Sequence, residues 1–387
     1  MKKILSLTVT LVLLLSLTAC GAANPSEPAQ TTAAVTTVPE TDPAEANRLL
    51  IDEMVGSMTT EEKVGQLFFV RCPDVDAVKT VSDYHIGGYI LFGRDFEEHT
   101  ADDVKENIAS YQQAAKVPLL IGVDEEGGSV VRVSDVLREE PFLSPKEYFA
   151  DGGWEAVEGA EREKADLLLS LGINVNLAPV VDITSDPETF IFQRSFSEKA
   201  DEVCSFAERT VGIYRDKQLG STLKHFPGYG DNEDTHTGIA RDPRPYSDFL
   251  SKDFLPFEAG IKAGADCVMV SHNIMECVDD ERPASLSDKV HQILRRDLNF
   301  TGVIMTDDLV MEAITDYTGA QTAAVAAVQA GNDLLCCSDL ENQYPAVLTA
   351  VENQEIPMEQ LDQSVRRVLT WKQSLGLLEN ITPPEAL

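Results

Sequence analysis

The stretch from 86 to 124 reads IGGYILFGRDFEEHTADDVKENIASYQQAAKVPLLIGVD. It begins and ends with short apolar runs, at 86–92 and 118–124, and the segment 102–116 between them has helical character. An apolar run bounded in this way indicates a strand buried on both faces, as in a parallel sheet. The stretch therefore predicts one strand, helix and strand unit of an α/β fold.

Six further apolar runs extend this pattern in both directions, at 65–70, 173–182, 221–225, 266–272, 302–308 and 332–338. Helical segments lie between them, and a final helix is expected over 358–378. Eight strands that alternate with helices predict a single (β/α)8 barrel of the TIM type. A doubly wound open sheet is the competing fold, but no GxGxxG follows the first strand, as expected of a dinucleotide-binding sheet.

The first 46 residues differ in composition from the predicted barrel. MKKILSLTVTLVLLLSLTAC has two lysines, a short apolar run and small residues before Cys20, which predicts a signal peptide over 1–19. Its end, LTAC, resembles the bacterial lipobox, in which the cysteine becomes lipidated; ordinary secretion with an incidental cysteine is the alternative. Residues 20–46 are rich in Ala, Thr and Pro and predict a flexible linker. The barrel is then expected over 47–378, with a tail over 379–387.

The chain is strongly acidic, with a formal net charge of -34. This charge repels phosphates and argues against nucleic acid as a partner. It also argues against a polybasic patch on a membrane surface, so the membrane is expected to be reached only through the lipid anchor. The expected location is extracytoplasmic, on the bacterial cell membrane.

Polar side chains end five of the predicted strands, namely Asp124, Asp182, Lys224 with His225, Ser271 with His272, and Asp307 with Asp308. Active sites of (β/α)8 barrels lie at the carboxyl ends of the strands, where the loops converge. An Asp after a strand also commonly caps the next helix, but five such ends favour a site. Carboxylates beside Lys224, His225, Arg132 and Arg194 suit sugar chemistry, which needs hydrogen bonds to hydroxyls and an acid as nucleophile.

A metal site is the rival interpretation of this face. The possible ligands are His225, His236, Asp231, Asp234 and His272. Lys224 adds positive charge where a cation would bind, so no metal is expected. His272 ends the sixth strand and is expected to line the pocket.

The segment KHFPGYGDNEDTH, residues 224–236, holds two of the six histidines of the chain. It resembles the KHFPGHGD...DSH signature of family 3 glycoside hydrolases, specifically the bacterial β-N-acetylhexosaminidases that act on peptidoglycan fragments. Other segments are similar to those of the family in the same order: MTTEEKVGQLFFV, IGGYILFGRD, IGVDEEGGSVVRV, NVNLAPVVDI followed by QRSFS, and GVIMTDDLVMEAI. The resemblance covers nearly the whole domain, from about Glu61 to the final helix.

The resemblance implies a role for each matching residue. Asp307 falls on the nucleophile and His236 on the general acid/base, with Asp234 orienting and charging the imidazole. The positions that bind the hydroxyls and N-acetyl group of the terminal sugar match Asp124, Arg132, Arg194, Lys224 and His225. Other interpretations stay open: Asp308 as the nucleophile, Arg132 and Arg194 as structural ion-pair partners, and 234–236 as a solvated acidic turn.

A histidine in place of the usual second carboxyl group has a physical rationale. Retaining glycosidases usually pair one attacking and one protonating carboxyl group. An imidazole titrates near neutrality, and Asp234 can bind one of its nitrogens so that the other faces the leaving oxygen. Pro227, Gly228 and Gly230 prevent a helix and suit a mobile loop that carries His236.

The expected protein is a hydrolase, a lipid-anchored retaining exo-β-N-acetylglucosaminidase that removes terminal N-acetylglucosamine from peptidoglycan fragments or related glycans without any cofactor. The alternatives are a family 3 β-glucosidase, a phosphorylase, and a non-catalytic sugar-binding lipoprotein. Tyr229 stands where the family usually has histidine, and Ser129 where it usually has arginine, which puts the substrate preference in doubt. The sequence leaves open the aglycone, the oligomeric state and the retention of the anchor.

Overall fold

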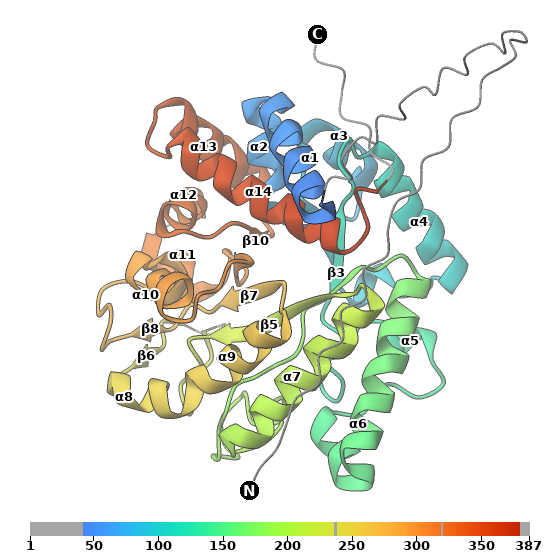
Figure 1. The fold of residues 1–387 in the computed structure, drawn as a ribbon, viewed down its shortest axis with the longest axis vertical. Coiled ribbons are helices and arrows are strands. Elements are labelled where there is room, and N and C mark those ends of the chain that lie inside the picture. Colours follow the sequence, from blue (N-terminus) through green and yellow to red (C-terminus); the bar gives the residue numbers. More distant parts are fainter. Residues whose placement is uncertain (1–41, 236–237, 319, 380–387) are drawn as a thin grey trace, which may run out of the picture. The chain divides into compact units, whose positions relative to one another are not determined.

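The computed structural model describes residues 42–235, 238–318 and 320–379. In the unit that begins at Pro43, eight parallel strands form one sheet in the order β10-β1-β2-β3-β4-β5-β7-β9 (Figure 1). The strands are β1 (Phe68–Arg71), β2 (Gly88–Leu91), β3 (Leu120–Val123), β4 (Val175–Asn176), β5 (Gly220–Phe226), β7 (Cys267–Val270), β9 (Val303–Thr306) and β10 (Leu335–Cys337). A parallel bridge between Met305 and Leu334 joins the two edges of this sheet. The predicted barrel and its eight strands are confirmed, and the open sheet is wrong.

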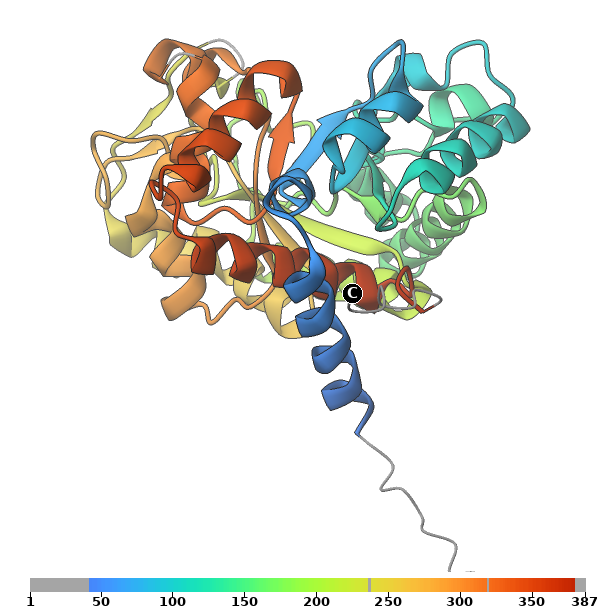
Figure 2. The ribbon, with the colours of Figure 1, turned by 90° about the horizontal axis from the view of Figure 1, so that it is seen from above.

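Helices alternate with the strands and pack around them (Figure 1). They are α1 (Pro43–Ser57), α2 (Thr60–Gln66), α3 (Ala77–Tyr84), α4 (Ala101–Ala114), α5 (Ser134–Leu137), α6 (Pro145–Ser170), α7 (Ala200–Lys217), α8 (Tyr246–Asp248), α9 (Phe254–Ala263), α10 (Asp288–Gln292), α11 (Glu312–Thr318), α12 (Ala320–Ala330), α13 (Leu340–Glu352) and α14 (Met358–Ser374). The final helix, α14, packs beside α1 (Figure 2). Helix α1 begins before the expected domain boundary at residue 47.

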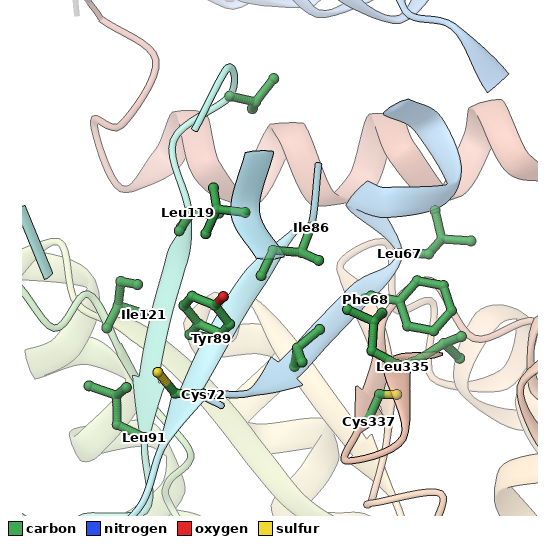
Figure 3. Close-up of a cluster of buried hydrophobic side chains, with 14 of the residues drawn as sticks. Leu67, Phe68, Cys72, Ile86, Tyr89, Leu91, Leu119, Ile121, Leu335 and Cys337 are labelled. Atoms are coloured by element: carbon green, nitrogen blue, oxygen red, sulfur yellow. The ribbon is translucent and has the colours of Figure 1, made fainter. Parts of the chain in front are cut away.

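Side chains that alternate between the two faces of each strand form two apolar layers. Phe68, Tyr89 and Ile121 face outward, in a cluster between the strands and the surrounding helices (Figure 3). Their neighbours Phe69 and Leu120 belong to a second cluster inside the barrel, which is formed by residues in or beside seven of the eight strands and by Val368 and Trp371 of α14. Successive side chains of a strand point to opposite faces. The apolar runs are continuous because both faces of each strand are buried.

A small residue inside the barrel makes room for a large one. A Cβ atom on Gly122 would lie 2.5 Å from Cζ of Phe69, so no larger side chain fits at this position.

The start of helix α4 is fixed by a local capping box. The side chain of Thr100 accepts from the Asp103 amide, and the Asp103 side chain accepts from the Thr100 amide.

Two short strands lie outside the barrel. β6 (Arg241–Asp242) pairs in parallel with β8 (Ile274–Met275), which ties the segment after β5 to the segment after β7. The sequence pattern did not predict this pair. Within the described residues, none of the helices has the length and apolar character needed to cross a membrane.

Candidate active site

A cavity of about 380 Å³ opens where the carboxyl ends of the barrel strands meet. Six of the predicted site residues line it, and they come from five separate segments of the chain: Asp124, Arg132, Arg194, Lys224, His225 and Asp307. Asp124 follows β3 directly, Lys224 and His225 lie on β5, and Asp307 follows β9. The barrel topology thus brings together residues that are up to 183 positions apart (307 minus 124).

Lys224 is the buried cation at the base of this cavity. Its side chain is 2% exposed, and its Nζ lies 2.5 Å from Oδ1 of Asp124 and 2.7 Å from Oε1 of Glu126. Burial alone lowers the pKa of Lys224, but the two carboxylates outweigh burial and raise it above its ordinary value. Lys224 is therefore a fixed ammonium group that holds Asp124 at the cavity wall.

Glu126 joins this lysine to an arginine. Nε and Nη2 of Arg194 donate to the two carboxylate oxygens of Glu126 over 2.9 and 2.8 Å. Burial raises the pKa of Glu126, yet Arg194 and Lys224 together hold it well below its ordinary value. Arg194 is thus an ion-pair partner and also lines the cavity.

His225 has one defined tautomer in this network. Nη2 of Arg194 lies 3.1 Å from Nε2 of His225, and an arginine can only donate. Nε2 is therefore an acceptor, and the proton is on Nδ1, which donates to Oδ2 of Asp182 over 2.7 Å. Asp182 is fully buried and also accepts the backbone N–H of His225, which fixes the orientation of the ring.

The two acids after β9 differ in their contacts. Asp307 continues the sheet, because its backbone N–H donates to the carbonyl of Val270 over 3.0 Å. Asp308 turns to the loop after β10: it accepts from the Ser338 hydroxyl, from the Ser338 amide at 3.2 Å and from the Val310 amide at 3.2 Å. Burial raises the pKa of Asp308. Both acids line the cavity, and the carboxylate of Asp307 accepts the Asp308 amide over 2.9 Å.

Arg132 is placed by a buried carboxylate. Glu125 is fully buried, and its Oε2 accepts the backbone N–H groups of Arg132 at 2.8 Å and Val133 at 2.7 Å. The side chain and amide of Ser134 donate to the other oxygen. Glu125 thereby folds the segment after β3 back on itself and directs Arg132 to the cavity.

The loop after β5 carries the predicted acid/base pair. Asp234 is half-buried on this loop and is not among the residues that line the cavity. His236 lies outside the described residues, as does Cys20. Thr235, between Asp234 and His236 in the sequence, is fully buried and lies 2.6 Å, through Oγ1, from the hydroxyl oxygen of Tyr229.

The rim of the cavity combines a cation with apolar side chains. Arg71, the last residue of β1, is exposed, and its guanidinium lies over the ring of Phe92 at 4.7 Å from the centroid. Val310 and Met311 line the same cavity. Such a rim offers stacking surface and a positive charge to whatever is attached to a bound sugar.

Two of the possible metal ligands are engaged by other groups. Both ring nitrogens of His225 are engaged, by Asp182 and Arg194. His272 is fully buried, with Nδ1 2.7 Å from Oγ of Ser285 and Nε2 3.0 Å from the carbonyl oxygen of Asp308. In the part of the chain that the structure describes, no group of three or more His, Cys, Asp or Glu side chains could hold a metal ion.

His272 corrects one expectation from the sequence. It is not among the residues that line the cavity, and its ring contacts Ser285 and the carbonyl oxygen of Asp308. Four residues of the site were not assigned from the sequence: Glu125, Glu126, Asp182 and Arg71. Asp182 had a signal in its strand-end position, and both glutamates precede the Gly127 and Gly128 pair in the DEEGG segment. For Arg71 the sequence offered no signal.

Several known proteins are similar to this chain in sequence. The model of the glycosyl hydrolase family 3 N terminal domain matches residues 59–371. A β-hexosaminidase of Xanthomonas campestris pv. campestris (strain B100) is 38% identical over 265 residues, 66% of this chain and 78% of the relative. The β-hexosaminidase LpqI of Mycobacterium tuberculosis (strain ATCC 25618 / H37Rv) is 33% identical over 328 residues, 81% of this chain and 83% of the relative.

The solved structure of a glycoside hydrolase family 3 β-N-acetylglucosaminidase from Paenibacillus sp. str. FPU-7 is also similar. Its TM-score is 0.78 at 34% sequence identity, and the match covers 86% of this chain. It spans 65% of the Paenibacillus chain, just under two thirds.

Proposed function

Because the chain belongs to glycosyl hydrolase family 3, as its sequence motifs indicated, we propose that it is a retaining exo-β-N-acetylglucosaminidase. The observation that carries this proposal is the convergence of Asp307 with Asp124, Lys224, Arg194 and His225 on one cavity. An acid at a strand end, faced by fixed hydrogen-bonding groups, is what attack on a bound sugar requires. The names of the relatives, β-hexosaminidase and β-N-acetylglucosaminidase, support the substrate class.

In the proposed mechanism Asp307 is the nucleophile. Its carboxylate attacks the anomeric carbon while the glycosidic bond breaks and the leaving oxygen takes a proton from His236, whose imidazole Asp234 orients. Water then gives a proton to His236 and attacks the same carbon, which releases Asp307 and the sugar with net retention. The backbone bond from Asp307 to Val270 supports this role, since it holds the attacking group at the end of β9.

The remaining cavity residues are proposed to bind the terminal sugar. Asp124 presents an acceptor and the Lys224 ammonium presents donors to its hydroxyl groups. Arg132 adds a further donor, and its Nη1 is held by the carbonyl of Val131. Arg194 and His225 contact each other in the same network. Because each of these side chains is already fixed by a partner, the sugar meets a preorganised set of groups.

The attached group is proposed to be a muramyl-type residue of a peptidoglycan fragment. Such a group carries a carboxylate, and the exposed guanidinium of Arg71 at the rim supports its recognition. A chitin-type aglycone would offer this arginine no charge. The proposed location agrees with such substrates: a lipid on Cys20 would anchor the enzyme at the outer face of the bacterial cell membrane.

The test is turnover of p-nitrophenyl β-N-acetylglucosaminide and β-glucoside by the chain lacking residues 1–20. We expect release from the N-acetyl substrate only, abolished in Asp307→Ala, and proton NMR of the first product should show the β-anomer. In His236→Ala, deglycosylation of this substrate with a good leaving group should become the slow step.

Two outcomes would favour an alternative. Glycosyl phosphate formed in phosphate buffer would identify a phosphorylase. Saturable binding of N-acetylglucosamine without turnover of either substrate would identify a sugar-binding lipoprotein and overturn the proposed mechanism.

A further inference from the structure

Tyr229 and Thr235 make a hydrogen bond that closes the loop after β5. The Tyr229 hydroxyl lies 2.6 Å from Oγ1 of Thr235, and the two side chains are 1% and 0% exposed. A tyrosine hydroxyl at such depth needs a partner. Thr235 directly follows Asp234 and directly precedes His236, so this bond acts on the part of the loop that holds the proposed acid/base pair.

The other side of Tyr229 is attached to the rigid part of the site. Its backbone N–H donates to Oδ1 of Asp182 over 2.8 Å, and the second oxygen of Asp182 holds His225. The Tyr229 ring makes edge contacts with His225, at 5.2 Å between centroids, and with Phe190, at 4.8 Å. One residue therefore connects the sugar-binding network to the loop.

Two further contacts hold the start of this loop. Thr184 donates to Asp231 over 2.6 Å, and Arg244 donates to the carbonyl of Gly228 over 3.3 Å. Gly230 has a positive φ of 56°, and a Cβ there would lie 2.7 Å from Cζ of Arg244. The Tyr229–Thr235 bond adds a link from the barrel side of the site to the described residues just before His236.

We propose that Tyr229 is a positioning residue of the reaction, which holds Thr235 and thereby sets the place of the acid/base loop; this inference rests on the proposed function. A tyrosine at this position replaces the family's usual histidine, and the loop carries a threonine hydroxyl within its reach. In this role the phenol exchanges no proton. Tyr229 acts on the loop through the hydrogen bond between its hydroxyl and that of Thr235.

The test compares Tyr229→Phe, Thr235→Val and the double variant on two substrates. p-Nitrophenol leaves without protonation, whereas the leaving sugar of a β-1,4-linked N-acetylglucosamine disaccharide must take a proton. We expect each single variant to lower kcat/KM for the disaccharide about tenfold, and kcat/KM for the p-nitrophenyl substrate less than twofold. The double variant should lose no more than either single one, because both remove the same bond.

Two variants serve as matched controls. Thr235→Ser keeps the hydroxyl and should retain activity on both substrates. Tyr89→Phe removes another buried tyrosine hydroxyl, which donates to the carbonyl of Ala77 over 2.7 Å away from this loop, and should leave the ratio of the two kcat/KM values unchanged. Equal losses on both substrates, or additive losses in the double variant, would overturn the proposal.

A second readout does not depend on activity. In hydrogen exchange followed by mass spectrometry, amides of the segment 231–240 should exchange at least about fivefold faster in Tyr229→Phe and Thr235→Val than in the native chain or Tyr89→Phe. Unchanged exchange would refute the positioning role even if the chain hydrolyses N-acetylglucosaminides. Faster exchange in a chain without such activity would uphold the hydroxyl pair as the device that holds the loop and would refute the proposed function alone.

Discussion

Arg194 and Glu126 form a two-bonded ion pair beneath the cavity, with Nε and Nη2 of the guanidinium 2.9 and 2.8 Å from the two carboxylate oxygens. Glu126 is 6% exposed and also faces Lys224 at 2.7 Å. Glu126→Gln removes the carboxylate that forms ion pairs with both of these cations. We expect a loss of about 3 kcal/mol in the free energy of unfolding, because the buried Arg194 loses its ion-pair partner, together with a large fall in kcat/KM. Urea unfolding and steady-state kinetics measure the two effects.

Glu158→Gln is the control for this change. Glu158 pairs with Arg162 at 2.9 Å and also with Arg209 on the surface, where both arginines are about half exposed. Exposed pairs contribute about 0–1 kcal/mol, so this variant should unfold like the native chain. Equal losses of unfolding free energy in the two variants would show that the buried Arg194–Glu126 pair contributes no more to stability than the surface pair.

The same glutamate predicts a pH dependence with a definite sign. Its folded pKa lies well below the ordinary value of 4.5, so in acid the unfolded chain binds a proton that the folded chain does not. The stability from ionised Glu126 is therefore fully present above pH 4.5 and is lost as the pH falls through the folded pKa. The difference in unfolding free energy between the native chain and Glu126→Gln should shrink below pH 4.5. A difference that stays constant from pH 6 to pH 3 would contradict this assignment.

Substitution of Asp307 should mainly lower kcat, whereas substitution of Asp308 should mainly lower the free energy of unfolding. Asp308 accepts from Ser338 and from the Val310 amide, so Asp308→Ala should lower the free energy of unfolding by about 1–3 kcal/mol through unpaired donors. Asp307→Asn should change stability by less than about 1 kcal/mol yet lower kcat by about a thousandfold or more, as for the loss of a nucleophile. Calorimetry and kinetics on both variants decide this, and the reverse pattern would make Asp308 the nucleophile.

Arg71 should affect the attached group and not the terminal sugar. In Arg71→Ala we expect kcat/KM to fall about three- to tenfold for an aglycone that carries a carboxylate, with no change for the p-nitrophenyl substrate. The effect should weaken as salt screens an exposed charge. Arg282→Ala, at another exposed arginine, is the control. A similar fall for a neutral chitin disaccharide would show that Arg71 contributes surface and not charge.

The barrel and half of the site network could be predicted because their signals are local. Each strand is an unbroken apolar run, and Asp124, Lys224 and Asp307 stand where those runs end. Glu126 and the Tyr229–Thr235 pair could not be assigned in this way, since their importance depends on contacts across the fold, such as the 2.8 Å bond from Arg194, which lies 68 residues away. His272 shows the converse. Its position at a strand end is local, but the direction of its side chain is set by Ser285 and by the backbone of Asp308.

Lys372 in α14 provides a test of the opposite end of the barrel sheet. It is fully buried, and its Nζ donates to Oε1 of Gln66 over 2.7 Å. Burial lowers its pKa from 10.5 to about 7, so between these values the unfolded chain binds a proton that the folded chain lacks. Stability should rise with pH over this interval, by up to about 1.4 kcal/mol per pH unit. Lys372→Met should abolish this rise between pH 7 and 9 in urea unfolding and should stabilise the chain at pH 7. The exposed Lys262→Met should keep the native slope, and a slope unchanged in Lys372→Met would show that this lysine stays charged in the core.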